Sequence, residues 1–158
     1  EAYLSYNVLL NLAAVCNTED KKTLWHFISR YRPDATPENA PTLDRLTEHA
    51  IEYYRVFVKP HKQYREPTEM ERAALSDLVQ TLTVLPPESE PEEIQTQIYE
   101  VGKRYDFEDL KSWFKTLYET LLGQSTGPRM GSFIALYGIS ETKVLIRRVL
   151  DGDNLGSE

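Results

Sequence analysis

The sequence predicts an all-α protein, a helical bundle or α-helix cage of about eight helices in two packed halves. Apolar residues recur at the three-to-four-residue spacing of helices along almost the whole chain. Only seven of the 158 residues are glycine, and nowhere do β-branched residues alternate with polar ones over a long run. Because 41% of the residues are hydrophobic, the chain can bury a core of one domain or of two small packed halves.

The first half, residues 1–84, is expected to form four helices. Their apolar stripes are Leu4, Val8, Leu9, Leu12, Val15 and Cys16; Leu24, Phe27, Ile28 and Tyr31; Leu43, Leu46, Ala50, Tyr53, Tyr54 and Phe57; and Leu75, Leu78, Val79 and Leu82. Thr18 is expected to cap the second helix, since two acids follow it. Three prolines make 32–41 a loop, and Pro60 should end or kink the third helix before a connector at 59–67.

The second half, residues 94–150, is expected to form the other four helices. Two longer helices carry Ile94, Ile98, Val101 and Tyr105, and then Phe107, Leu110, Trp113, Phe114, Leu117, Tyr118 and Leu121. After a loop at 123–127, two short helices are expected at 129–137 and 140–150. The acidic, proline-rich segment 85–93 is the expected connector between the halves, and the tail 151–158 is expected to be disordered.

Composition limits the cellular setting and the chemistry. No apolar run is long enough to cross a membrane, and no signal peptide is visible. Cys16 is the only cysteine, which rules out an intrachain disulfide and fits the reducing cytoplasm. The chain begins with Glu1 in a helical pattern, so we expect it to be a piece of a longer or processed protein.

No catalytic or metal-binding pattern stands out. The three histidines, His26, His49 and His61, have none of the spacings that zinc sites use. Neither type of glycine-rich phosphate loop occurs. We therefore expect no catalytic residue, no metal ligand and no cofactor-binding residue in these 158 residues.

The segment RVFVKPHKQYR, residues 55–65, is the strongest basic cluster in a chain of net charge −7. It holds four cations and no acid, together with one tyrosine: Arg55, Lys59, Lys62, Arg65 and Tyr64. One interpretation is a solvated helix end, where cations complement the helix dipole. The other is a patch that contacts phosphates, with an aromatic ring available to stack on a base.

The segment GPRMGSFIALYG, residues 127–138, contains one isolated cation. From 123 to 139 there is no acid, and Arg129 is the only charged residue. Pro128 suits the first turn of a helix, whose free N–H groups can bind acceptors. The arginine either points into water or, together with those N–H groups, contacts a nucleotide base or phosphate.

Five ordered segments, YNVLLNLAAVCNTED, LWHFISRY, FVKPHKQYR, WFKTLYETLLGQ and GPRMGSFIALYG, resemble the C-terminal part of class I lysyl-tRNA synthetases. The resemblance covers roughly residues 3–150. It implies an upstream Rossmann-type domain that ligates lysine to tRNA(Lys) with ATP, and whose two nucleotide motifs are missing from this sequence. The fragment itself would then be the helical anticodon-binding region, inactive alone, with no cofactor of its own. Its partners would be the tRNA(Lys) anticodon stem-loop and its own catalytic domain.

The last third also resembles the end of glutamyl-tRNA synthetases, where a Thr-Pro-Gly-type loop before a short apolar helix helps to recognise the anticodon. Thr126, Gly127, Pro128 and Arg129 lie at the comparable place. The resemblance thus makes Arg129 the candidate base contact, with Thr126, Ser132 and the N–H groups near Gly131 as helpers. Arg55, Lys59, Lys62 and Arg65 are the candidate phosphate contacts, and Tyr64 the candidate stacking residue.

Two other functional classes stay open at this point. The chain could be a helical protein–protein interaction module with no RNA role, using an exposed groove for a partner helix. An independent small enzyme has no visible nucleophile–base pair or metal set to support it.

Overall fold

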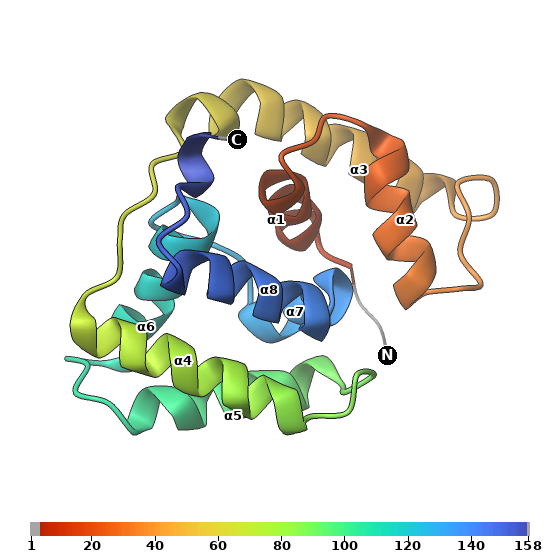
Figure 1. Ribbon diagram of the computed structural model, residues 1–158. Helices are drawn as coiled ribbons and strands as arrows, with labels where there is room; N and C mark the ends of the chain where they lie inside the picture. The colour runs from red at the N-terminus through yellow and green to blue at the C-terminus, as the bar shows by residue number, and fades with distance from the viewer. Residues whose placement is uncertain (1–3, 158) are drawn as a thin grey trace. The chain divides into compact units, whose positions relative to one another are not determined.

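Helices account for nearly all the regular structure in the computed structural model, which describes residues 4–157 (Figure 1). That range contains eight α-helices and four shorter helical turns, and no β-strand. The all-α prediction is therefore confirmed. The chain divides into two units, Glu1–His61 and Lys62–Glu158, which are described separately.

The first unit is built on three helices, α1 (Tyr6–Cys16), α2 (Lys21–Tyr31) and α3 (Pro41–Tyr53). The third continues into a π-helical turn, η1 (Tyr54–Val58), and a 3-10 turn, η2 (Lys59–His61). Helix α1 packs against α3, and fully buried side chains from three helices and η1 form the core: Leu9, Leu12, Leu24, Ile28, Ala50 and Tyr54. Proline at 60 thus coincides with the end of this helical run, as expected.

Two polar contacts fix the helices of the first unit. The buried Tyr54 donates its hydroxyl to Oδ1 of Asn17 at 2.8 Å, across a sequence separation of 37 residues. Asn17 has a φ of 51° and ends α1, where its backbone N–H satisfies carbonyls of the last turn. On α2, the indole N–H of Trp25 donates to Asp44 at 2.8 Å, which ties α2 to α3.

The second unit contains the remaining five helices: α4 (Glu69–Val84), α5 (Pro91–Lys103), α6 (Leu110–Leu117), α7 (Met130–Tyr137) and α8 (Ile139–Leu150). A π-helical turn, η3 (Tyr118–Leu122), extends α6, and a 3-10 turn, η4 (Leu155–Ser157), follows α8. Helix α5 packs on α7, and α4 packs on α8. The core side chains include Leu75, Leu78, Ile98, Trp113, Leu117, Phe133 and Ile146.

Trp113 is the largest fully buried side chain of the molecule. Its indole N–H donates to the carbonyl of Ile98 at 3.0 Å, so the buried polar group is satisfied. The ring lies directly against Gly102, where an added Cβ would overlap it. A glycine in the last turn of α5 therefore makes room for the tryptophan of α6.

The division between the units differs from the expected one. It lies between His61 and Lys62, before α4, whereas the sequence predicted a connector at 85–93 between halves 1–84 and 94–150. Helix α4 joins the second unit because its apolar face packs on α5 and α8. The segment 85–93 is thus a turn between two helices of one unit.

The tail differs too. Residues 151–157 were expected to be disordered, yet they include η4, and Leu155 is buried. The guanidinium of Arg72 also donates to the carbonyl of Leu150 at 2.6 Å, which holds the end of α8. Residue 158, the last of the predicted tail, lies outside the described residues.

The predicted cap of α2 is displaced by two residues. Asp20 caps the helix by accepting from the backbone N–H of Lys22 at 3.0 Å. The hydroxyl of Thr18 instead accepts from the N–H of Asp20, one turn before the helix.

Candidate nucleic-acid interface

The turn before α7 is held from one side by a tyrosine. Helix α7 begins at Met130, so Pro128 precedes the helix and Arg129 occupies the N-cap, one step later than the sequence predicted. Tyr118 of η3 donates its hydroxyl to the carbonyl of Pro128 at 2.9 Å. Its ring lies against Gly127, where any Cβ would overlap it. The glycine is therefore needed for the ring to pack on the turn.

Gly131 has a structural partner and differs from the expected helper role. Its buried N–H donates to Oε1 of Gln95 on α5 at 2.6 Å. A Cβ at this position would overlap the carbonyl oxygen of Pro91 and would lie 2.8 Å from Cβ of Gln95. The amide is thus used for close packing of α7 on α5, and it is not presented to a ligand.

Arg129 remains an exposed cation at this turn. Its side chain is 49% exposed, and its guanidinium lies 3.9 Å from a carboxylate oxygen of Glu92 at the start of α5. Residues 123–139 contain no acid, but the fold brings Glu92 close to Arg129. Both side chains are well exposed, so this ion pair is weak and can give way to another anion. Thr126 is also exposed, and Ser132 is half-buried.

The basic segment 55–65 is split between the two units. Arg55 and Lys59 belong to the first unit, and each has an acidic partner. Arg55 pairs with Glu52 at 2.6 Å, and Lys59 with Glu19 at 2.8 Å. The hydrogen bond that Lys59 donates to Glu19 raises the pKa of Lys59 above its ordinary value, so the ammonium stays charged. These cations are exposed but locally neutralised.

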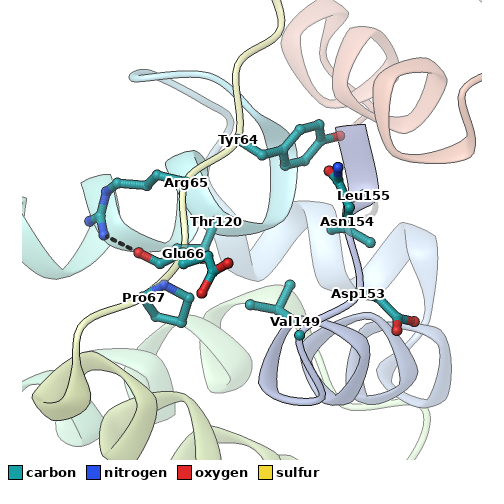
Figure 2. Close-up of a pocket in the computed structure, with 10 residues that line it drawn as sticks. Tyr64, Arg65, Glu66, Pro67, Thr120, Val149, Asp153, Asn154 and Leu155 are labelled. Atoms are coloured by element: carbon teal, nitrogen blue, oxygen red, sulfur yellow. Dashed lines mark hydrogen bonds between the residues drawn. The ribbon is translucent and has the colours of Figure 1, made fainter. Parts of the chain in front are cut away.

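Lys62, Tyr64 and Arg65 begin the second unit, and their side chains have different surroundings. The ammonium of Lys62 lies over the Tyr64 ring, 5.5 Å from its centre, in a cation–π contact. The ring itself packs on Gly123, whose φ of 70° brings the backbone close. Figure 2 shows Tyr64 pointing toward Asn154 and Leu155, with Arg65 on the other side of the chain. The expected stacking residue is therefore packed against its own unit.

Arg65 is the centre of an ion-pair network. Its Nε donates to Glu119 at 2.6 Å, and its two terminal nitrogens donate to Glu71 at 2.8 and 3.0 Å. Glu71 also accepts from the N–H of Thr68 and the hydroxyl of Thr116. Arg65, one of the expected phosphate contacts, is thus a structural cation. It joins the segment 62–68, which precedes α4, to α6 and η3.

The same network controls the ionisation of Glu71. Burial alone would raise the pKa of this carboxyl group. The hydrogen bonds from Arg65, Thr68 and Thr116 outweigh burial and lower the pKa from 4.5 to about 2. The two carboxylates in turn raise the pKa of Arg65. The network is fully charged at neutral pH.

A cavity of about 250 Å³ lies between residues 64–67 and the segment 149–155, with Thr120 at its base (Figure 2). Its charged lining consists of one cation, Arg65, and two carboxylates, Glu66 and Asp153. Arg129 does not line it. The cavity is therefore separate from the candidate base contact, and the Arg65 guanidinium that lines it is already paired with Glu71 and Glu119.

Helix α6 and the start of η3 carry a mixed aromatic and basic face that was not expected from the sequence. Lys111, Phe114, Lys115 and Tyr118 follow the i, i+3, i+4, i+7 spacing of one helix face. The two lysines are exposed, and the two aromatic rings are half-buried. The apolar spacing had assigned both rings to the core stripe, which in the structure consists of Trp113 and Leu117. Lys111 and Lys115, which lie on the same helix face as the two rings, were the sequence signal that this face is exposed.

Among residues 4–157, no group of three or more His, Cys, Asp or Glu residues is placed to hold a metal ion. No helix in the same range is long and apolar enough to cross a membrane.

Comparison with known proteins relates the chain to one part of a tRNA ligase. The particular relatives are lysine–tRNA ligases from Rickettsia. The chain is 53% identical over 147 residues to the lysine–tRNA ligase of Rickettsia bellii strain OSU 85-389, covering 93% of the chain and 28% of the relative. Identity is 50% over 143 residues for the Rickettsia akari (strain Hartford) ligase, covering 90% and 27%. For the Rickettsia prowazekii (strain Madrid E) ligase it is 48% over 147 residues, covering 93% and 28%.

The chain is therefore homologous to a region of lysine–tRNA ligase, and it spans little more than a quarter of the curated relatives it matches. No protein-family model matches it. No solved structure matches it.

Proposed function

We propose that this chain is the C-terminal anticodon-binding region of a class I lysyl-tRNA synthetase, and that it binds the anticodon stem-loop of tRNA(Lys). Ligation of lysine with ATP belongs to an upstream catalytic domain, so the fragment alone is inactive. The exposed Arg129, held at the N-cap of α7, is the observation that carries the proposal. Homology to lysine–tRNA ligases supports the choice of RNA.

The chemistry of the turn suits an unpaired base. Anticodon bases are single-stranded, so their edges are open to side chains. Lysine anticodons are rich in uridine, as the family resemblance implies, and uracil carries two carbonyl acceptors. The guanidinium of Arg129 offers donors at a fixed place, because Tyr118 and Gln95 hold the residues around it. Thr126 and Ser132 are the neutral helpers.

Of the predicted phosphate contacts, Arg65 is removed from the proposal by its ion-pair network. Lys62 stays in it as a half-buried cation beside Tyr64. Arg55 and Lys59 stay as exposed cations of the first unit, which must exchange a carboxylate for a phosphate on binding.

The test is binding of the 158-residue chain to the tRNA(Lys) anticodon stem-loop and to a control loop with a changed anticodon. Arg129→Ala should weaken cognate binding about 5- to 150-fold and weaken control binding less, because a lost base contact costs ~1–3 kcal/mol of discrimination. Arg147→Ala, an exposed cation on α8, is the matched charge control. Equal losses on both loops would remove the base-recognition role.

A second experiment addresses the phosphates. Lys62→Ala should lower affinity for both loops alike and reduce the slope of log affinity against log salt by about one. An unchanged slope would exclude Lys62 from phosphate binding. Adenylate formation by the chain alone would contradict the assignment of catalysis to an upstream domain.

One observation favours a second candidate function, a helical protein–protein interaction module. Tyr53, Val56 and Phe57 of the first unit are exposed apolar side chains, and the Tyr53 and Phe57 rings lie 4.9 Å apart. A partner helix could cover such a patch. If the wild-type chain binds neither stem-loop at low salt, this function replaces the RNA proposal.

A further inference from the structure

Tyr99 is an exposed aromatic residue on the helix face that supports the Arg129 turn. Glu92, Gln95 and Tyr99 are spaced by three and four residues, so they share one face of α5. Glu92 lies near Arg129, and Gln95 accepts from the N–H of Gly131. Tyr99 lies about two helical turns along the same face from Glu92. The residue is 39% exposed.

The ring of Tyr99 has a fixed orientation. It meets the ring of Phe114 on α6 edge to face, with the centres 5.3 Å apart and the planes at 68°. Such a contact stabilises the pair and leaves one face of the outer ring accessible. Phe114 itself is half-buried against the unit. Tyr99 is thus an ordered, solvent-facing aromatic plane.

Cations flank this plane on the next helix. Lys111 and Lys115 lie one turn apart on α6, on the face that includes Phe114. The side chain of Lys115 is 61% exposed, and its nearest acid, Glu119, lies 3.9 Å away. Glu119 makes a much shorter pair, at 2.6 Å, with Arg65. Its charge is therefore already compensated by another cation.

Tyr118 connects this face to the Arg129 turn. It continues the same face in η3, directly after α6, and its ring packs on Gly127 while its hydroxyl donates to the carbonyl of Pro128. A nearby Tyr99 contributes to the raised pKa of Tyr118, after burial as the main cause, which agrees with their proximity. The surface thus runs from the α6 lysines through Tyr99 and Tyr118 to Arg129.

We propose that Tyr99, Lys111 and Lys115 form a second contact surface for the unpaired nucleotides of the same RNA, with a base stacked on Tyr99 and phosphates at the two lysines. The inference rests on the proposed function, because it extends the RNA path away from Arg129. An aromatic plane beside exposed cations is the combination by which single-stranded nucleic acid is bound. A partner protein helix would instead need an apolar stripe, and the lysines interrupt it.

The experiment uses the 158-residue chain and a tRNA(Lys) anticodon stem-loop with 2-aminopurine substituted at one loop position at a time. Stacking on a protein ring quenches this base, so the fluorescence locates the contact. Tyr99→Leu keeps an apolar side chain against Phe114 but removes the aromatic plane. We expect it to abolish the quenching at one position and to weaken binding about 5- to 150-fold, from ~1–3 kcal/mol per stacked base. Tyr99→Trp should preserve both the quenching and the affinity.

Lys111→Ala and Lys115→Ala should each reduce the salt slope by about one. Phe57→Ala, which removes a more exposed ring from the first unit, is the control and should leave the quenching unchanged. If Tyr99→Leu quenches and binds like the wild type while Arg129→Ala still loses cognate preference, the second surface is overturned and the proposed function stands. If the wild type shows no preference for the cognate loop, the proposed function itself fails. Loss of quenching in Phe57→Ala alone would move the stacking site to the first unit.

Discussion

The backbone N–H of Gly131 donates to the side-chain oxygen of Gln95 at 2.6 Å, and both residues are buried. Through this contact the first turn of α7 rests on α5, two residues from the exposed Arg129. The amide that the sequence offered as a ligand contact is therefore part of the support. Because the backbone under Arg129 is already held in place, binding a ligand there costs less conformational entropy.

Gly131→Ala should destabilise the second unit by about 1–3 kcal/mol, because the added methyl group overpacks a buried helix contact. The measurement is urea unfolding followed by circular dichroism. Gly156→Ala is the control, since a Cβ there would lie 3.3 Å from its nearest atom, Oδ1 of the exposed Asn154, and would overlap no backbone atom. Equal stability of the two variants would mean that α7 can move away from α5 at little cost.

Acid should weaken the second unit through Glu71. Its folded pKa, about 2, lies below the ordinary value of 4.5. A group with a lowered folded pKa stabilises the fold above its unfolded pKa, and that contribution is lost as pH falls from about 4.5 to 2. The loss should reach about 3 kcal/mol as an order of magnitude. Unfolding free energies measured between pH 6 and pH 2 test this.

Glu71→Gln should be less stable than the wild type at pH 6 and should lose less stability on acidification. Glu69→Gln, an exposed acid in the same helical turn, is the control and should follow the wild-type curve. A wild-type curve that is flat across this window would show that the network holds equally well with a neutral Glu71.

Glu92→Gln should strengthen RNA binding. The carboxylate lies 3.9 Å from the Arg129 guanidinium and competes with an incoming acceptor. Because both side chains are exposed, the gain should be modest, about two- to fivefold in affinity. Glu93→Gln, the neighbouring exposed acid, separates a local effect from a change of net charge. A larger gain from the neighbour would mean that only net charge matters.

Leu155→Ala should release the tail from the second unit. The side chain is buried at the start of η4, and removing it should cost about 2 kcal/mol. Hydrogen exchange of amides 153–157 should become faster than in the wild type. Val144→Ala, an exposed site on α8, should leave these rates unchanged. Exchange that is equally fast in wild type and variant would favour the disordered tail expected from the sequence.

The helices were predictable because their apolar stripes are long and regular. Trp113 and Leu117, for example, follow the helical spacing and are buried as the spacing requires. The unit boundary was not predictable in the same way. Proline-rich composition marks a turn but does not tell which helices pack together, and α4 joins the unit that follows it.

The candidate site was predictable only in part. Arg129 is exposed at a helix N-cap close to where the glycine–proline context put it. Arg65 could not be separated from the other cations of 55–65, because its partners Glu71 and Glu119 come from elsewhere in the chain. Charge along a sequence shows which cations exist, whereas ion pairing depends on the acids that folding brings near them.

Tyr64, near the start of the second unit, lies beside the tail that follows α8. A Cβ at Gly156 would lie 3.5 Å from the Tyr64 ring, so the first and last described segments of this unit lie side by side. A short linker could join these two segments without stretching the chain, which is the geometry that circular permutation requires.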